Sequence, residues 1–237
     1  KYLPLVYGTY FNGLSLISTK TASEKAFQVL LTPRKGKVGP NQETFLNVAK
    51  DRRLQVGANT LQVYKWHGDK ETILLLHGWE SNSFRWRNLI SKLQEENYNI
   101  VAFDAPAHGY STGKLFHVPL FTECTRAVME IYHPKYIIGH SVGVTTALYS
   151  QCKYPDNPEE KIVGIGAPSN LSAFMQRYQR TLKLNQKVMQ GLDDYLKEKF
   201  DFNTAGFSLD RFVPDLHQQG LLIHDVLDTI TPFQDAA

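Results

Sequence analysis

Five short apolar runs constrain the fold of this 237-residue chain more than any other feature. They read TILLLHG, NIVAFDAP, KYIIGHS, KIVGIGAP and GLLIHDV, and each run meets Gly, Pro, Asp or His where it ends. Most are separated by roughly 25 to 30 residues of helical pattern, which gives each parallel connection room for a crossover helix. A strand that is apolar throughout is buried on both faces. The pattern therefore predicts an α/β fold, a mostly parallel sheet covered by helices on both faces.

Changes of pattern along the chain suggest four regions. Residues 1–40 mix aromatic and apolar residues and end in the basic, turn-rich TPRKGKVGP, which suggests an N-terminal helical extension. Residues 41–168 contain the alternating TLQVYKW and four of the apolar runs, and form the first part of the core. Residues 169–219 exceed what a crossover needs and carry apolar residues at helical spacing, which predicts a helical cap insertion above the carboxyl ends of the strands. Residues 220–237 return to the core.

The overall composition argues against several classes of protein. The 26 Lys and Arg and 23 Asp and Glu give a net charge of +3, and the basic residues are scattered, so we expect no nucleic acid partner. No apolar run approaches the roughly 18 residues of a membrane span. We favour packing of the N-terminal extension on the body of the protein over membrane association. Cys124 and Cys152 form no Cys-x-x-Cys pair, so we expect reduced thiols and a cytoplasmic protein.

The sequence also lacks the patterns of common metal and nucleotide sites. It contains no His-x-His or His-Glu-x-x-His pair and no paired Cys and His ligands. It has no Gly-x-Gly-x-x-Gly loop, and PAHGYSTGK lacks the Walker spacing. We therefore expect neither a metal nor a cofactor.

The segment YIIGHSVGV carries the strongest chemical signal. An apolar strand that turns at once into a helix places its turn residue in a strained conformation, and Gly139 and Gly143 remove side chains that would collide there. Ser141 would then stand at the strand tip as a nucleophile, with the Val142 N–H at a helix N-terminus where negative charge is favoured. The alternative is a Gly-rich turn whose serine only caps the helix.

The segment ILLLHGWES places a loop at the same edge of the sheet. Its Trp79 N–H could join that of Val142, so that both donate to the oxygen that becomes negative during acyl transfer. Alternatively, the segment is a tight strand exit with Trp79 packed in a core. We expect His77 to hold the loop through hydrogen bonds.

Four segments together resemble the α/β-hydrolase fold family in order and spacing. They are HGWESNSFRWRNLI, VAFDAPAHGYSTG, IIGHSVG and LLIHDVLDTITPF, within a stretch from about residue 54 to residue 233. The resemblance implies that Ser141 is the nucleophile, that the Trp79 and Val142 amides form the oxyanion hole, and that Asp104 braces a loop. The single glycine of His-Gly-x resembles the esterase and lipase branches.

The family resemblance also implies an acid and a base. The acid follows Ser141 on a later strand, and Asp228 matches the family spacing before Thr-Pro better than Asp225 does. The base of the family lies beyond the acid, whereas all eight histidines precede Asp228. We therefore expect the protein to continue past Ala237 by about 30 to 50 residues, with one more strand, a loop that bears a histidine, and a helix.

Three functions fit these features. The first is a serine hydrolase that acts on small carboxylic esters through an acyl-enzyme at Ser141. The second is a non-catalytic α/β-hydrolase scaffold that binds a small apolar ligand, since a fold does not by itself imply an activity. The third keeps the acyl-enzyme but passes the acyl group to an alcohol or amine.

Overall fold

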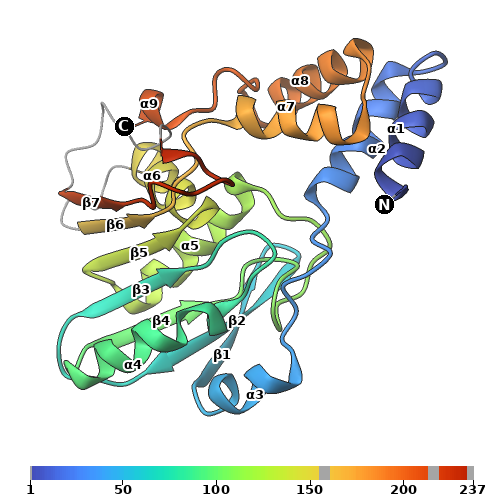
Figure 1. Cartoon of the computed structure of the whole chain (residues 1–237). Coiled ribbons are helices and arrows are strands. Elements are labelled where there is room, and N and C mark those ends of the chain that lie inside the picture. The colour runs from blue at the N-terminus through green and yellow to red at the C-terminus, as the bar shows by residue number, and fades with distance from the viewer. Residues whose placement is uncertain (1, 155–160, 213–218, 234–237) are drawn as a thin grey trace. The chain divides into compact units, whose positions relative to one another are not determined.

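The computed structural model describes residues 2–154, 161–212 and 219–233, and it divides into two compact units (Figure 1). One unit combines Lys1–Thr32 with Ser169–Arg211, and the other combines Pro33–Pro168 with Phe212–Ala237. The sequence suggested separate pieces at 1–40 and 169–219, whereas the contacts place most of both pieces in one helical unit.

The second unit is built on a seven-stranded sheet with the order β1-β2-β4-β3-β5-β6-β7. The pairs β1–β2 and β2–β4 are antiparallel, and all other neighbouring pairs are parallel. The five apolar runs form β3 to β7, so the predicted mostly parallel sheet is confirmed. The strands are β1 (Lys50–Val56), β2 (Asn59–Trp66), β3 (Thr72–Leu76), β4 (Asn99–Phe103), β5 (Tyr136–His140), β6 (Lys161–Ile165) and β7 (Gly220–Ile223).

Helices cover both faces of this sheet. Ala102 of β4 belongs to a buried cluster with Ile90, whereas its neighbour Phe103 contacts the ring of Phe121, with 5.5 Å between the ring centroids. Because successive strand residues point to opposite faces, the helices that carry Ile90 and Phe121 cover opposite faces. The helical elements of this unit are α3 (Pro40–Asn47), the 3₁₀ helix η1 (Ser83–Trp86), α4 (Arg87–Glu95), α5 (Val118–Tyr132) and α6 (Val142–Lys153).

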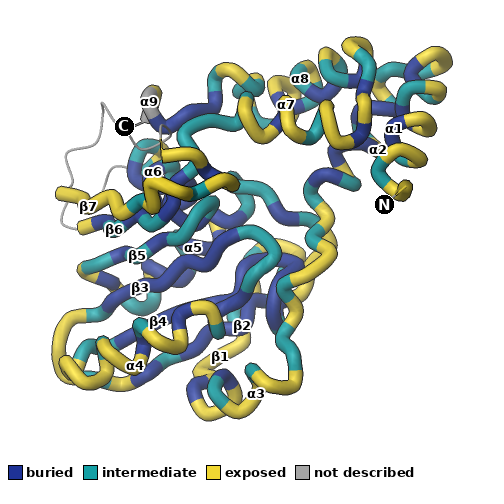
Figure 2. Tube along the Cα trace, in the orientation of Figure 1, coloured by how far each residue is buried: buried dark blue, intermediate teal, exposed yellow. Residues whose placement is uncertain are grey.

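The helical unit has a core of its own, visible as buried stretches along its helices in Figure 2. Phe11, Phe27 and Leu30 pack with Val188 and Leu192 in one buried cluster. The N-terminal helices and the helices after β6 therefore bury their apolar faces against each other, which is why they form one unit. The helices are α1 (Leu3–Leu14), α2 (Thr19–Leu31), α7 (Leu171–Leu182) and α8 (Gln186–Phe200), followed by the short α9 (Leu209–Phe212).

Hydrogen bonds link the same two segments. The Asn12 amide donates to the Lys183 carbonyl at 2.9 Å, and the Asn185 N–H donates to the Asn12 side chain at 2.8 Å. The Tyr178 hydroxyl donates to the Ala26 carbonyl at 2.8 Å. None of the helices in the described parts of the chain is long and apolar enough to cross a membrane.

Candidate active site

Ser141 occupies the single position between a strand and a helix. Strand β5 ends at His140 and α6 begins at Val142, and Ser141 between them has φ 53° and ψ −125°. A residue with a side chain is strained in this region of backbone space, and such strain concentrates at functional sites. The Ser141 N–H donates to the Ile165 carbonyl at 2.9 Å, which fixes the turn to the end of β6.

The two glycines of the motif allow this turn. A Cβ atom on Gly139 would lie 2.7 Å from the Val144 nitrogen, and a Cβ atom on Gly143 would collide with the Leu76 carbonyl oxygen. Both contacts are with main-chain atoms that cannot rotate away. The spacing Gly-x-Ser-x-Gly is therefore required by close packing of the strand–helix turn, as the sequence predicted.

The loop after β3 passes directly beside Ser141. A Cβ atom on Gly78 would lie 3.2 Å from the Ser141 Cβ, so this stretch of main chain adjoins the serine. Within the described residues, the N–H groups of Trp79 and Val142 have no hydrogen-bond partner. Two main-chain donors next to Ser141 are thus left for an incoming oxygen atom.

Two buried histidines hold this loop. His77 Nδ1–H donates to the Gly78 carbonyl at 2.8 Å, while its Nε2 accepts the Ala105 N–H at 3.0 Å. His108 Nε2 accepts the Glu80 N–H at 3.0 Å, and its Nδ1–H donates to the Pro106 carbonyl at 2.9 Å. The hydrogen bonds of His77 are those expected from the sequence.

Burial keeps both imidazoles neutral. It lowers the pKa of His77 despite the nearby Asp104 carboxylate, and it lowers the pKa of His108 to about 3. Each neutral ring has one donor and one acceptor nitrogen, and both nitrogens are used in the bonds that hold the loop. Neither histidine is therefore available as a base for Ser141.

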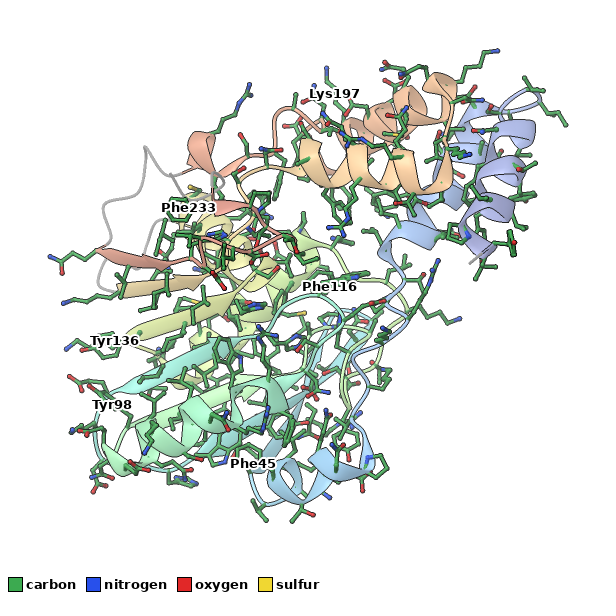
Figure 3. All side chains as sticks on the ribbon, in the orientation of Figure 1. Phe45, Tyr98, Phe116, Tyr136, Lys197 and Phe233 are labelled. Carbon is green, nitrogen blue, oxygen red and sulfur yellow. The ribbon has the colours of Figure 1, made fainter. Side chains whose placement is uncertain are left out.

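The Trp79 side chain is packed, although the main-chain N–H of this residue has no partner among the described residues. Its ring lies 5.7 Å from that of His108 and 5.4 Å from that of Phe116, measured between centroids, and Figure 3 labels Phe116. Edge-to-face contacts of this kind fix the ring and, with it, the main chain of the residue. The sequence analysis offered two alternatives, a Trp79 ring packed in a core and a Trp79 main-chain N–H beside Ser141. The structure has both.

Asp104 is completely buried and satisfied by four hydrogen bonds. Its carboxylate accepts from the Tyr64 hydroxyl at 2.7 Å, the Ser83 N–H at 2.9 Å, the Ser83 hydroxyl at 2.8 Å and the Tyr110 N–H at 2.9 Å. Burial and this carboxylate raise the pKa of Tyr64 well above its ordinary value. These bonds tie three segments together, so Asp104 has the contacts of a structural brace.

Asp228 lies in the turn after β7. Its carboxylate accepts the Ile230 N–H at 2.7 Å, the Thr231 N–H at 3.0 Å and the Thr231 hydroxyl at 2.8 Å. The main-chain N–H of Thr231 is the largest cause of a lowered pKa of Asp228, so this half-buried carboxyl is ionised. The carboxylate of Asp225, the other candidate, accepts only the Leu227 N–H, at 2.9 Å, among the described residues.

Asp228 reaches the edge of the sheet at which Ser141 stands. A Cβ atom on Gly166, just after β6, would lie 3.8 Å from Asp228 Oδ2 and 4.0 Å from His140 Nε2. The carboxyl ends of β5, β6 and β7 therefore bring the predicted nucleophile and the predicted acid to one edge, where ligands bind in open α/β sheets.

His140 is engaged elsewhere. Its Nε2 lies 2.5 Å from a guanidinium nitrogen of Arg85, and since guanidinium has no acceptor, the imidazole accepts. Burial and the Arg85 charge lower the pKa of His140 to about 4. His224 Nε2 bonds the Thr231 carbonyl at 2.7 Å. In the part of the chain that the structure describes, no histidine bonds the Ser141 hydroxyl, and His217 lies outside that part.

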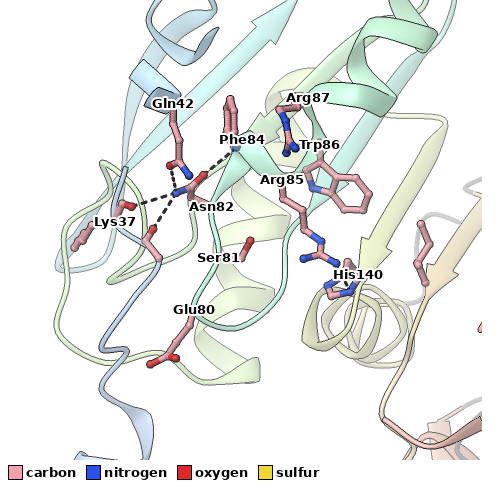
Figure 4. Close-up of a pocket in the computed structure, with 12 residues that line it drawn as sticks. Lys37, Gln42, Glu80, Ser81, Asn82, Phe84, Arg85, Trp86, Arg87 and His140 are labelled. Carbon is pink, nitrogen blue, oxygen red and sulfur yellow. Dashed lines mark hydrogen bonds between the residues drawn. The ribbon is translucent and has the colours of Figure 1, made fainter. Parts of the chain in front are cut away.

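Arg85 was missed in the sequence. It stands in a 3₁₀ helix beside a pocket of about 510 Å³, which Figure 4 shows with Arg85 directed toward His140. The only signal in the sequence was a positive charge in SNSFRW, between residues that pack in the core.

A family model described as the alpha/beta hydrolase fold matches residues 71–224, more than half of the chain. A serine hydrolase-like protein of Danio rerio is 31% identical over 129 residues, which are 51% of this chain and 39% of the relative. An esterase of Mycobacterium tuberculosis is 28% identical over 124 residues, 50% of this chain and 40% of the relative. The matched part therefore spans about two fifths of the length of these curated relatives.

Solved structures share the fold. A Pyrococcus furiosus esterase has a TM-score of 0.63 at 22% identity, covering 87% of this chain and 81% of the esterase. An esterase from Exiguobacterium antarcticum has a TM-score of 0.58 at 17% identity, covering 75% and 81%. With the family model matching most of the sheet unit, including the strand–serine–helix turn, the chain belongs to the α/β-hydrolase fold family.

Proposed function

We propose that this protein is a serine hydrolase that cleaves small carboxylic esters through an acyl-enzyme at Ser141. The observation that carries the proposal is the strained Ser141 at the strand–helix turn, beside the main-chain N–H groups of Trp79 and Val142, which no described residue pairs with. The esterases among the relatives and structural neighbours support the same reaction class.

The reaction follows from this arrangement. The Ser141 hydroxyl attacks the ester carbonyl while a base takes its proton, and the carbonyl oxygen becomes negative. That oxygen accepts from the Trp79 and Val142 N–H groups, each of which would contribute about 3 to 4 kcal/mol to transition-state stabilisation. The intermediate then expels the alcohol, which takes the proton from the base. Water attacks the acyl-enzyme in the same way and releases the carboxylic acid.

The base in this mechanism is a histidine oriented by Asp228. The ionised carboxylate of Asp228 is held by main-chain N–H groups, so it would fix the tautomer of an imidazole and stabilise its cationic form. His140 is poorly suited to this role, because its Nε2 accepts a hydrogen bond from Arg85.

One observation favours the non-catalytic alternative. No histidine of the described residues hydrogen-bonds the Ser141 hydroxyl, and a serine without a base is a weak nucleophile. The alternative function is a scaffold that binds a small apolar ligand. The two functions differ in the reactivity of Ser141.

The test is reaction with a fluorophosphonate probe, together with hydrolysis of p-nitrophenyl esters, in the natural protein that carries this sequence. We expect labelling at Ser141 and a loss of turnover of about 10⁴-fold or more in Ser141→Ala. Asp228→Asn should lower turnover by roughly 10³ to 10⁴-fold, and Asp225→Asn serves as the matched control with a much smaller effect. An unlabelled serine, or turnover in Ser141→Ala within about tenfold of wild type, would contradict the proposal.

A further inference from the structure

We propose that the pocket beside Ser141 binds a carboxylate group of the ester substrate, and that Arg85 is the residue that recognises it. The inference rests on the proposed function, because it names the class of ester that Ser141 would cleave. It predicts half-esters of dicarboxylic acids, or esters with a second anionic end, as preferred substrates.

The first argument is that Arg85 lacks a counter-ion. Its one hydrogen bond in the described residues is to the neutral His140 ring, and no Asp or Glu of those residues pairs with it. Burial alone lowers the pKa of Arg85. The partial removal of its guanidinium from water is therefore unfavourable, and no attraction to a carboxylate offsets that cost. An incoming anion would supply the missing charge and pair with the unused N–H groups of the guanidinium.

The second argument is the charge of the pocket lining. Arg87 adds a second positive charge, with its guanidinium stacked 4.7 Å from the centroid of the Phe84 ring. The acid in the lining is Glu80, whose Oε1 accepts the Arg34 N–H at 2.8 Å. Lys37 is also in the lining, where its Nζ donates to the Ser111 carbonyl at 3.3 Å. Two guanidinium groups and one ammonium group thus face one carboxylate, and this positive balance favours an anionic ligand.

The third argument is that the pocket wall is already in place. The Asn82 side chain donates to Gln42 Oε1 at 2.9 Å and to the Gly36 carbonyl at 3.2 Å, and its oxygen accepts the Phe84 N–H at 3.0 Å (Figure 4). Asn82 is buried, so these bonds fix the segment before α3 against the segment that carries Arg85. A wall held in this way would not have to be ordered when a ligand binds.

The fourth argument is the position of the pocket next to the nucleophile. His140 and Ile165 both line it, and Ser141 follows His140 in the chain and donates its N–H to the Ile165 carbonyl at 2.9 Å. Ser141 is not itself among the lining residues, so the substrate that we infer holds its carboxylate at Arg85 and extends past His140 to place its ester at Ser141. A role of Arg85 confined to holding His140 would instead affect neutral and anionic esters equally.

The binding experiment uses glutarate, which contains no ester, so its result does not depend on catalysis. Calorimetric titration should give a Kd in the millimolar range or below for wild type and at least about tenfold weaker binding for Arg85→Met. Arg85→Lys should lie between them. Arg52→Met removes an exposed arginine paired with Asp51, and it should bind like wild type.

Two results of this titration would overturn the inference. One is the absence of glutarate binding to wild type up to about 20 mM, and the other is equal binding by wild type and Arg85→Met. Inorganic phosphate is titrated in parallel. Tighter Arg85-dependent binding of phosphate than of glutarate would overturn the assignment of a carboxylate.

The kinetic experiment compares mono-p-nitrophenyl glutarate with neutral p-nitrophenyl pentanoate. Wild type should favour the anionic ester in kcat/KM by about tenfold, mainly through KM, and the ratio should fall to about one in Arg85→Met. Equal kcat/KM values for the two esters in wild type would overturn the inference and leave the proposed function standing. Arg85-dependent glutarate binding without hydrolysis of either ester would overturn the proposed function and leave the anion site standing.

Discussion

Among the individual residues, Ser141 combines an unfavourable conformation with an accessible position at a strand tip. Its φ of 53° is one that residues with a side chain rarely adopt, and the strain of such positions costs about 1 to 3 kcal/mol. Packing around Gly139 and Gly143 holds the serine there. The fold thus gives up stability to present this hydroxyl group.

This strain leads to a prediction about stability. Ser141→Gly should be more stable than Ser141→Ala by about 1 kcal/mol, because glycine tolerates the positive φ whereas alanine keeps the strained Cβ. At an unstrained site the order is the reverse, since glycine gains more freedom in the unfolded chain. Urea unfolding of the two variants measures the difference. A less stable glycine variant would mean that the turn is not strained.

Residues that directly follow a predicted strand could be placed from the sequence, whereas residues farther from a strand could not. His77 and Asp104 each directly follow a buried strand, so their place at one sheet edge was readable from the pattern. The elbow glycines were equally readable, because their contacts are within the motif and with the neighbouring strand. Arg85 was not, because its missing counter-ion and its contact with His140 depend on how η1 packs beside β5.

Among the larger elements, the loop after β3 is held by two neutral imidazoles rather than by strands or helices. His77 and His108 lie with their ring centroids 5.2 Å apart, and each bonds the main chain of the loop and of the segment after β4. Because protonation would remove the acceptor of each ring, the loop depends on both rings staying neutral.

The stability of the protein should therefore depend on pH through His108. Its pKa is about 3 in the fold and 6.5 ordinarily, so below pH 6.5 the unfolded chain binds a proton that the folded chain does not. Stability from this group is complete above that pH and is lost as the pH falls toward 3. In His108→Gln, the loss of unfolding free energy between pH 7 and pH 5 should be smaller by about 2 kcal/mol than in wild type.

Urea unfolding at the two pH values measures this change. Phe116→Leu is the matched control, because Phe116 packs on the His108 ring with centroids 5.1 Å apart and carries no titrating group. It should lower stability equally at both pH values. The same pH dependence in His108→Gln as in wild type would show that His108 is not the neutral group that holds the loop.

The strands differ in how readily the sequence reveals them. Strands β3 to β7 are continuous apolar runs, and β2 alternates, so all were predicted. Strand β1 reads KDRRLQV and is mostly exposed, and it forms because Gly57, at φ 54°, turns the chain back onto β2. A strand that forms by pairing with its neighbour, and not by burying apolar side chains, shows no alternation of apolar and polar residues in the sequence.

In the molecule as a whole, two segments separated by more than half of the chain build the helical unit. The sequence predicts helices in both segments, but nothing in it says which helices face each other. The structure supplies the answer at Gly8 and Gly191. A Cβ atom on Gly8 would collide with the Leu182 carbonyl oxygen, and one on Gly191 would collide with the Ser23 hydroxyl oxygen. Because neither glycine carries a side chain, two backbones approach closely at Gly8, and side chains of α2 pack against the backbone of α8 at Gly191.

Substitution of Gly8 tests whether the two segments depend on each other. In Gly8→Leu the new side chain has no space between α1 and α7, so these helices must separate and expose the shared core around Phe11 and Leu182. Hydrogen exchange should then show loss of amide protection in α7 and α8 as well as in α1, by about 10²-fold or more, while β3 to β5 keep theirs. Gly13→Ala, in the same helix with no atom within 4 Å of the new Cβ, should leave all of these rates unchanged. Unchanged protection of α8 in Gly8→Leu would mean that the later segment folds without the N-terminal helices.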